Sequence, residues 1–103
     1  MSDFYIKRGD RGPSLAATMQ DPDGIAIDLT AASAVKFKMG TAVDAEAVIV
    51  DADAGTVRYD WDEGDTNVAG TFNAEFEIEW ADGRKQTVPN DGYFTVAIGR
   101  DLG

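Results

Sequence analysis

Two observations predict an all-β fold, a sandwich of about seven or eight short antiparallel strands. Apolar and polar residues alternate with a period of two in several segments, which is typical of strands with one face in a core and one in water. Turn sequences separate these segments at short, fairly regular intervals. The chain has 103 residues, so we expect residues 1–103 to form a single domain with a modest core.

The expected strands of the first half are short. Leu15–Met19 is an apolar segment that precedes the first strong turn sequence. Further on, Val35, Phe37 and Met39 alternate with two lysines, which places three apolar side chains on one face of a strand. The apolar run over residues 47–50 predicts another strand. Each of these segments is too short to form a core helix of ordinary length.

The second half carries the clearest alternation. Val57, Tyr59 and Trp61 alternate with charged residues. A longer strand is predicted from Phe72 to Trp80, because a helix would scatter its apolar residues around the circumference. Lys85–Val88 and the alternating run through Phe94, Val96 and Ile98 complete the series. The residues of the long strand that should face the core are Phe72, Ala74, Phe76, Ile78 and Trp80.

Turn sequences rich in Asp, Gly and Pro separate the strands. They are Asp21-Pro22-Asp23-Gly24, the segment Asp51–Gly55, the pair Asp82-Gly83 and Pro89-Asn90-Asp91-Gly92. Asp82-Gly83 is typical of a tight hairpin turn. Only Thr30–Ala34 and Asp65–Ala69 could hold a turn of helix.

Acidic residues dominate the charge of the chain. There are 19 Asp and Glu against nine Lys and Arg, which gives a net charge of −10. A field of this sign repels phosphate backbones and anionic lipids, so we expect neither a nucleic acid nor a membrane as partner. No apolar stretch approaches the roughly 20 residues that cross a bilayer, and no signal peptide is visible.

Histidine and cysteine are both absent from the sequence. Their absence excludes disulfides, thiolate nucleophiles, serine triads and histidine-based metal centres. Neither of the Gly-rich phosphate-binding motifs occurs. Only carboxylate chemistry stays open, as an acid pair of the glycosidase kind or as an oxygen-ligated cation.

Three acidic clusters could in principle bind calcium. The segment Asp51–Gly55 resembles the opening of a calcium loop, but Thr56 and Asp62 stand where an EF-hand has Gly and Glu. We interpret these aspartates as turn residues whose side chains bond the local backbone. The clusters are Asp21 with Asp23, Asp51 with Asp53, and Asp60 with Asp62, Glu63 and Asp65.

Glu75, Glu77 and Glu79 share one face of the long strand, about 6.8 Å apart at each step. This spacing is near that of an inverting glycosidase pair. A solvated strand face offers no desolvation that would separate two pKa values, so we interpret the glutamates as a solvated face. The same face could also contact a basic partner or discourage sheet-edge association by charge.

The larger aromatic residues could form a platform for sugar rings. Tyr59 and Trp61 are in phase with Val57, however, and Trp80 is in phase with Phe76. These are core phases, so we interpret the aromatic residues as core. The set that a sugar platform would use is Tyr59, Trp61, Trp80 and Tyr93.

The order and spacing of landmarks along the chain resemble a known family. The landmarks are Phe4-x-Ile6-Lys7-Arg8-Gly9-Asp10, the strand Leu15–Met19, Asp21-x-Asp23-Gly24-x-x-Ile27-Asp28-Leu29-Thr30, Val35-x-Phe37-x-Met39, Ile49-x-Asp51, Gly55-x-Val57-x-Tyr59-x-Trp61, Asp65-Thr66, Gly70-x-Phe72-x-Ala74-Glu75-Phe76, Asp82-Gly83 and Thr87-x-Pro89. This series resembles the N-terminal immunoglobulin-like domain of tailed-phage upper baseplate proteins and related small virion proteins of phages and prophages. The resemblance extends from about Phe4 to Ile98.

The resemblance implies an immunoglobulin-like β-sandwich with a structural, non-enzymatic role in the virion of a tailed phage or prophage. It brings no catalytic, cofactor-binding or metal-binding residue and no cofactor. Because the sequence stops at Gly103, without the linker and scaffold that follow this domain in baseplate proteins, we expect a small tail, baseplate, neck or head accessory protein. It would be made in the bacterial host cytoplasm and act through contacts with other virion structural proteins, with a homo-oligomeric ring as one form of assembly.

Two other functions stay open at this point. One is a surface-binding β-sandwich module for carbohydrate or with calcium, and the other is a carboxylate-dependent hydrolase. Lys7, Arg8 and Arg11 form the densest basic group of the acidic chain. We hypothesise that this group helps to dock the domain to an acidic neighbour.

Overall fold

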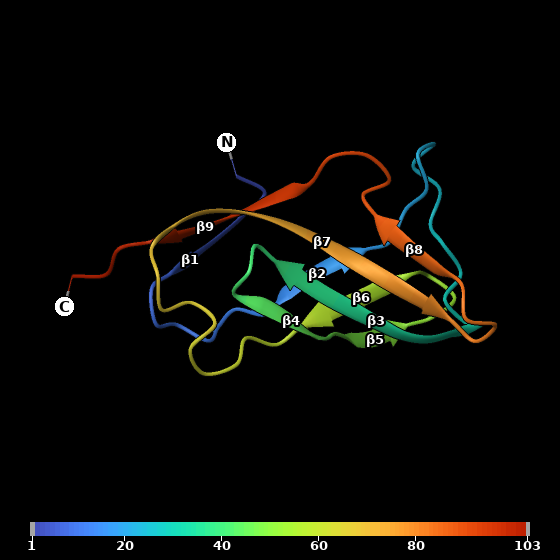
Figure 1. Ribbon diagram of the computed structural model, residues 1–103, viewed down its shortest axis with the longest axis horizontal. Helices are drawn as coiled ribbons and strands as arrows, with labels where there is room; N and C mark the ends of the chain where they lie inside the picture. Colours follow the sequence, from blue (N-terminus) through green and yellow to red (C-terminus); the bar gives the residue numbers. More distant parts are fainter. Residues whose placement is uncertain (1, 103) are drawn as a thin grey trace.

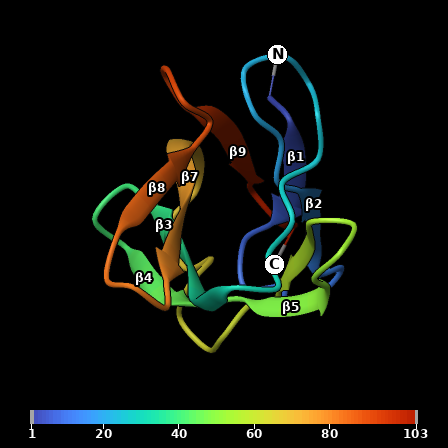
Figure 2. The same cartoon turned by 90° about the vertical axis from the view of Figure 1, so that its right-hand side faces the viewer.

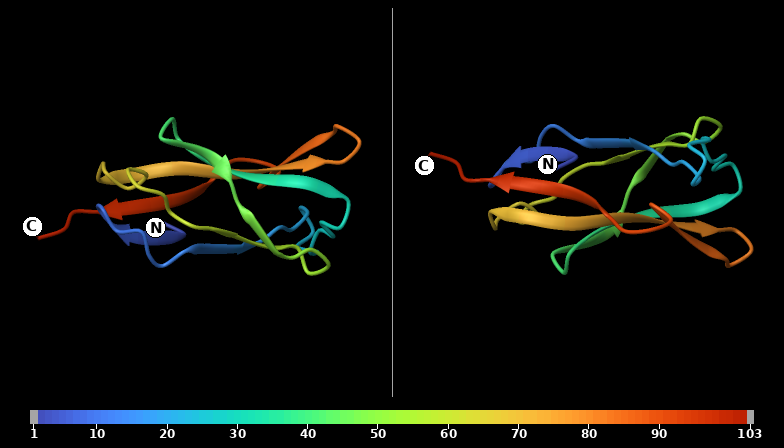
Figure 3. Two further views of the ribbon diagram at one scale, coloured as in Figure 1. Left: turned by 90° about the horizontal axis from the view of Figure 1, so that it is seen from below. Right: turned by 90° about the horizontal axis from the view of Figure 1, so that it is seen from above.

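A computed structural model describes residues 2–102, so that Met1 and Gly103, the ends of the expected domain, lie outside the described residues. The described residues form nine strands and no helix, in two sheets that pack face to face (Figures 1 and 3). Hence they contain no helix long and apolar enough to span a membrane. The strands are β1 (Phe4–Lys7), β2 (Leu15–Thr18), β3 (Ala32–Met39), β4 (Val43–Glu46), β5 (Val48–Asp51), β6 (Thr56–Tyr59), β7 (Gly70–Trp80), β8 (Lys85–Val88) and β9 (Phe94–Gly99).

The larger sheet is built around β7, the longest strand. Its order is β1-β9-β7-β3-β4, and β8 also pairs with β7. β9 pairs with the first half of β7 and β8 with the second half, so β8 and β9 follow each other along the edge of β7 opposite β3. The smaller sheet has the order β2-β6-β5, which leaves β2 and β5 as its edge strands.

The prediction of an all-β sandwich is confirmed, and two details of it are wrong. The described chain has nine strands, and β1 runs parallel to β9 with Phe4 opposite Val96. Two parallel strands that pair need a long connection in the chain. Here all the other strands of the sandwich lie between β1 and β9 in the sequence. The strands β1 and β4 were not predicted. β4 combines Val43 with an alanine and two acidic residues and so gives little apolar signal.

The helical turns considered for the sequence do not form. Residues 30 and 31 make a turn, and Ala32 already begins β3. The other segment, Asp65–Ala69, starts in a turn and leads into β7 without a helix. Alanines dominate the first of these segments, but its place opposite Trp80 in the sheet overrides their helical preference.

The core lies between the two sheets and is centred on Phe37, which is fully buried. The ring of Phe37 stacks on Tyr59 at 4.6 Å between centroids and meets the edge of Trp61 at 5.6 Å. The alternation predicted for the strands is confirmed here, since inward residues of β3, β6, β7 and β9 supply most of the core. The fully buried side chains include Phe37, Phe76, Met19, Leu29, Met39, Ile78, Val35, Val57 and Val96.

Candidate functional site

The acidic turn residues bond their own backbone, as the sequence predicted. Asp21 Oδ1 accepts the backbone N–H groups of Asp23 at 2.9 Å and Ile25 at 3.0 Å. Asp51 Oδ1 accepts the N–H of Ala54 at 3.2 Å in the next acidic turn. Both arrangements close local turns and engage carboxylate oxygens that a cation would need. Residues 2–102 contain no group of three or more acidic side chains placed to hold a metal ion.

The third acidic cluster is divided between two separate contacts. Asp60 Oδ1 accepts hydrogen bonds from Ser14 Oγ at 2.6 Å and from Arg58 Nε at 2.8 Å. These bonds, first that of Ser14 and then that of Arg58, lower the pKa of the Asp60 carboxyl. Asp60 therefore ties β6 to the segment before β2 rather than joining its acidic neighbours.

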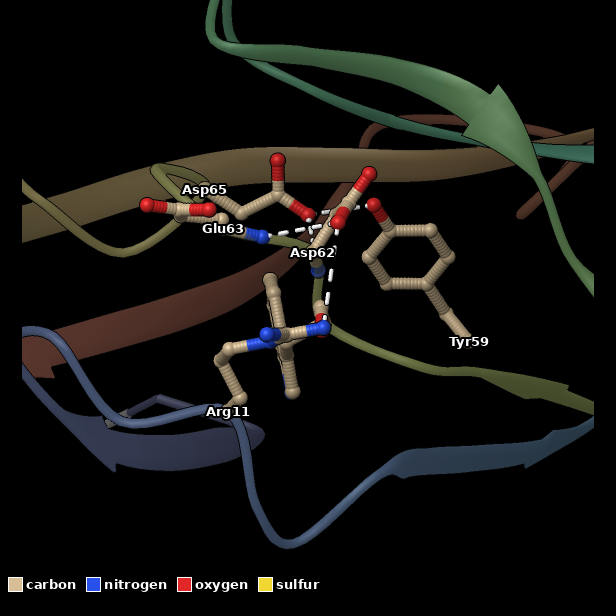
Figure 4. A network of polar contacts seen from close by, with 6 residues as sticks. Arg11, Tyr59, Asp62, Glu63 and Asp65 are labelled. Atoms are coloured by element: carbon tan, nitrogen blue, oxygen red, sulfur yellow. Dashed lines mark hydrogen bonds and ion pairs between the residues drawn. The ribbon is translucent and has the colours of Figure 1, made fainter.

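The rest of the cluster forms a network around the buried Tyr59 (Figure 4). The Tyr59 hydroxyl donates to Asp65 Oδ2, and the same oxygen accepts the backbone N–H of Asp62 at 2.8 Å. Asp62 in turn accepts the N–H of Glu63 at 2.8 Å and lies 3.8 Å from the Arg11 guanidinium. Burial, then the bond to Asp65, raises the pKa of Tyr59. The network fixes the loop that follows β6.

A second polar contact links the same loop to the N-terminal segment. Thr66, the buried polar residue of the core boundary, donates from Oγ1 to the carbonyl of Asp10 at 2.8 Å. The indole N–H of Trp61 donates to the carbonyl of Pro13 at 3.1 Å. These bonds hold the connection between β1 and β2 against the loop after β6. Their role is structural, since each satisfies a polar group at the edge of the core.

The glutamates of β7 lie on the outer face of the larger sheet, as predicted, but they are less solvated than expected. The side chain of Glu77 is 17% exposed and contacts Lys38 Nζ at 3.3 Å and Lys85 Nζ at 3.9 Å. Glu79 contacts Lys36 Nζ at 3.6 Å. The hydrogen bond that Lys38 donates to Glu77, and then the negative charge of Glu77, raise the pKa of Lys38. Cross-strand ion pairs thus occupy two of the three carboxylates, Glu77 and Glu79, that a glycosidase mechanism would need free.

The aromatic residues divide between the core and the surface. Tyr59 and Trp61 are buried and Trp80 is half-buried, in keeping with the predicted core phases. Tyr93 is 61% exposed in the segment before β9. A planar sugar platform made from all four residues therefore does not form.

The basic N-terminal group has acidic partners inside the domain. Arg8 pairs with Asp101 at 2.8 Å, and Arg11 pairs with Asp62 at 3.8 Å. Lys7 Nζ donates to the carbonyl of Arg100 at 3.4 Å. The contacts of Arg8 and Lys7 hold the N-terminal and C-terminal segments side by side, as Figure 1 also shows for β1 and β9. Docking of this group to an acidic neighbour stays a prediction.

Comparison with sequence models of protein families matches residues 3–100 to the BppU N-terminal domain. The chain belongs to this family. The match covers the full span from β1 to β9, and it confirms the resemblance to the N-terminal domain of upper baseplate proteins. Neither curated proteins nor solved structures give a match. The BppU N-terminal domain is a structural domain of phage baseplates, and membership of this family implies a component of the virion.

Sequence reasoning assigned no catalytic, cofactor-binding or metal-binding residue to the chain. What sequence reasoning missed is a hollow between the edges of the two sheets, beside β2. Its position depends on which strands lie at the edges. The alternation of residues carries no signal for that, because edge and central strands alternate alike.

Proposed function

We propose that this chain is a non-enzymatic structural component of a tailed-phage or prophage virion, located in the tail, baseplate, neck or head, that works through protein–protein contacts. The observation that carries the proposal is the family match over residues 3–100. The absence of His and Cys from the sequence supports a role without catalysis, because it removes the commonest general base and the thiolate nucleophile.

The proposal extends to the fold. Residues 1–103 form one immunoglobulin-like domain in this account. Support comes from the two packed sheets, from the parallel pairing of β1 with β9, and from the central antiparallel pairing of β7 with β3 and β9. A sandwich of this type presents both sheet faces and edge strands to neighbours, which suits an assembly module.

The proposed partners are other virion structural proteins, encountered after synthesis in the bacterial host cytoplasm. Assembly into a homo-oligomeric ring is part of the proposal, because most homo-oligomers have closed point-group symmetry. Nucleic acid and membrane surfaces are not proposed as partners, since the net charge of −10 opposes both.

Labelling of intact particles tests this proposal. A copy of the chain with a C-terminal epitope tag, expressed during particle production, should sediment with purified particles and bind gold-labelled antibody at one defined position.

Charge reversal of Arg8 and Arg11 to Glu tests the docking hypothesis in the same assay. Unchanged incorporation of that double variant would reject docking through the basic group, and failure of the unmodified tagged chain to join particles would reject the structural role.

A further inference from the structure

An elongated groove opens along the edge of β2, between the two sheets. Two adjoining hollows of about 310 and 370 Å³ share Thr18, Val88 and Pro89 in their walls. The first reaches Asp3 and Phe4, and the second ends between the turn after β2 and the connection from β8 to β9. Figure 2 shows where the strands β2, β8 and β9 lie in the ribbon. We call this surface the β2 groove.

The floor of the β2 groove belongs to the core. Leu15, Met19 and Phe76 line it, and each is almost fully buried in the domain. Phe4 and Phe94 are only half-buried beside them. Because the floor itself is already buried, the apolar area that a bound segment would cover belongs mainly to the half-buried Phe4 and Phe94.

The wall of the groove is an edge strand. β2 pairs only with β6 among the described residues, so alternate backbone N–H and C=O groups face away from the smaller sheet. Ala16 and Thr18 are exposed, whereas Ala17 is half-buried in the groove. An extended segment laid beside β2 would add a fourth strand to the smaller sheet and cover the apolar floor.

The charges around the groove are of one sign. Asp3 lines the first hollow, and Asp21 and Asp91 line the second, while neither hollow is lined by Lys or Arg. None of these three aspartates has an ion-pair partner within residues 2–102. A bound segment with Lys or Arg at its ends would complement them. A second copy of a chain with net charge −10 fits this surface poorly.

We propose that the β2 groove binds an extended segment of another virion protein, one that alternates apolar residues and carries basic residues at its ends, by strand addition to β2. This inference rests on the proposed structural function and gives it a specific contact surface. β2 has four residues, and side chains alternate between the two faces of a strand. A segment paired with β2 along its whole length would therefore direct two apolar side chains into the groove.

Titration of the ¹⁵N-labelled chain with two capped peptides, Lys-Val-Thr-Val-Thr-Val-Lys and its counterpart with Glu at both ends, tests the proposal. The lysine peptide should shift the backbone amide signals of Ala16, Thr18 and Val88 and bind about tenfold more tightly than the glutamate peptide. The proposal would be overturned if no β2 signal shifts or if both peptides bind equally. It would also be overturned if the same signals shift with protein concentration alone, because a second copy would then be the occupant.

Matched variants separate the groove from general charge and folding effects. Asp91→Lys should weaken the lysine peptide about tenfold, whereas Asp44→Lys, an exposed position on β4, should not. Ala17→Phe should fill the groove and abolish binding, while Ala97→Phe on β9, outside the groove, should leave it intact. Equal effects within either pair would overturn the proposal.

Incorporation into particles distinguishes failure of this proposal from failure of the structural function. Ala17→Phe protein should be excluded from particles that accept Ala97→Phe protein. If particles incorporate both variants, the groove proposal is wrong and the structural function stands. If the unmodified chain is absent from particles although the lysine peptide binds, the structural function is wrong and the groove remains a peptide-binding site.

Discussion

The Tyr59 hydroxyl donates to Asp65 Oδ2, the oxygen that also accepts the backbone N–H of Asp62 at 2.8 Å. The Asp65 carboxylate thus joins the end of β6 to the loop that follows, at the edge of the core. Tyr59 also stacks on Phe37 at 4.6 Å between ring centroids. The residue therefore serves both as a core aromatic and as a hydrogen-bond donor, which explains its burial despite its polar group.

Replacing Tyr59 with Phe separates these two roles. The ring remains in the core, but Asp65 loses a donor, so we expect the free energy of unfolding to fall by about 1–3 kcal/mol. Urea denaturation at pH 7 measures this change. Tyr93→Phe is the control, because that side chain is 61% exposed, and its effect should stay within about 0.5 kcal/mol. Equal effects of the two variants would contradict the role given to Asp65.

The raised pKa of Tyr59 predicts a loss of stability in alkali. The unfolded chain releases this proton near the ordinary tyrosine pKa of about 10, while the folded chain still holds it. The contribution is complete below that pH and is lost as the pH rises from there toward the folded pKa. Stability measured from pH 8 to pH 11.5 should fall more steeply for the wild-type chain than for Tyr59→Phe; parallel curves would contradict the assignment.

Gly55 occupies a position that no other residue fits. Its φ is +73°, and a Cβ there would lie 2.5 Å from the carbonyl oxygen of Ile27 and 3.1 Å from that of Met19. We expect Gly55→Ala to cost about 2–4 kcal/mol, because strain and backbone overlap add. Gly83→Ala is the matched control, since φ there is +91° with nothing within 4 Å of the added Cβ. Its cost should be about 1 kcal/mol, and thermal unfolding of both variants compares them.

Phe37 is the centre of the aromatic core. Its ring lies within 6.2 Å of the centroids of Tyr59, Trp61, Phe76 and Phe94. Truncation in Phe37→Ala should cost about 3–5 kcal/mol, a large share of the stability of a small domain. Val50→Ala, at a position 57% exposed, should change stability by less than about 0.5 kcal/mol. A small effect at Phe37 in urea denaturation would contradict the packing described.

The ion pairs of the β7 face predict an effect that depends on salt. Glu77 contacts two lysines, Lys38 and Lys85, while Glu75 is in no ion pair of the described residues. Glu77→Gln should therefore lower the melting temperature more than Glu75→Gln does. The difference should shrink in 1 M salt, because salt screens the lysine partners, of which Lys85 is 64% exposed. Calorimetry of both variants at low and high salt measures it. A difference that does not change with salt would show that the lysine contacts are not its cause.

The buried positions were predictable wherever a strand has one dry face. Val35, Phe37 and Met39 follow a strict period of two, so the sequence alone places them in the core. β4 escaped prediction because it is short and has only Val43 and an alanine on its inward face, which gives a weak apolar signal. The parallel pairing of β1 with β9 escaped as well, since it joins segments at opposite ends of the chain.

The surface relationships depend on strand register, and the sequence does not specify register locally. Lys38 and Glu77 both lie on predicted wet faces, but their contact exists because β3 pairs with β7 across a separation of 39 residues. The β2 groove likewise depends on β2 lying at the edge of its sheet. Long-range pairing of this kind follows from the packing of the whole sandwich, which alternation within one strand does not encode.

Mass spectrometry of purified, induced particles tests the central claim most directly. The measurement is the copy number of this chain relative to the major tail and capsid proteins. Our account predicts that the chain is present in a fixed ratio corresponding to a multiple of about three, five or six copies per particle, as a closed ring or shell requires. Absence of the chain from finished, infectious particles would contradict the account.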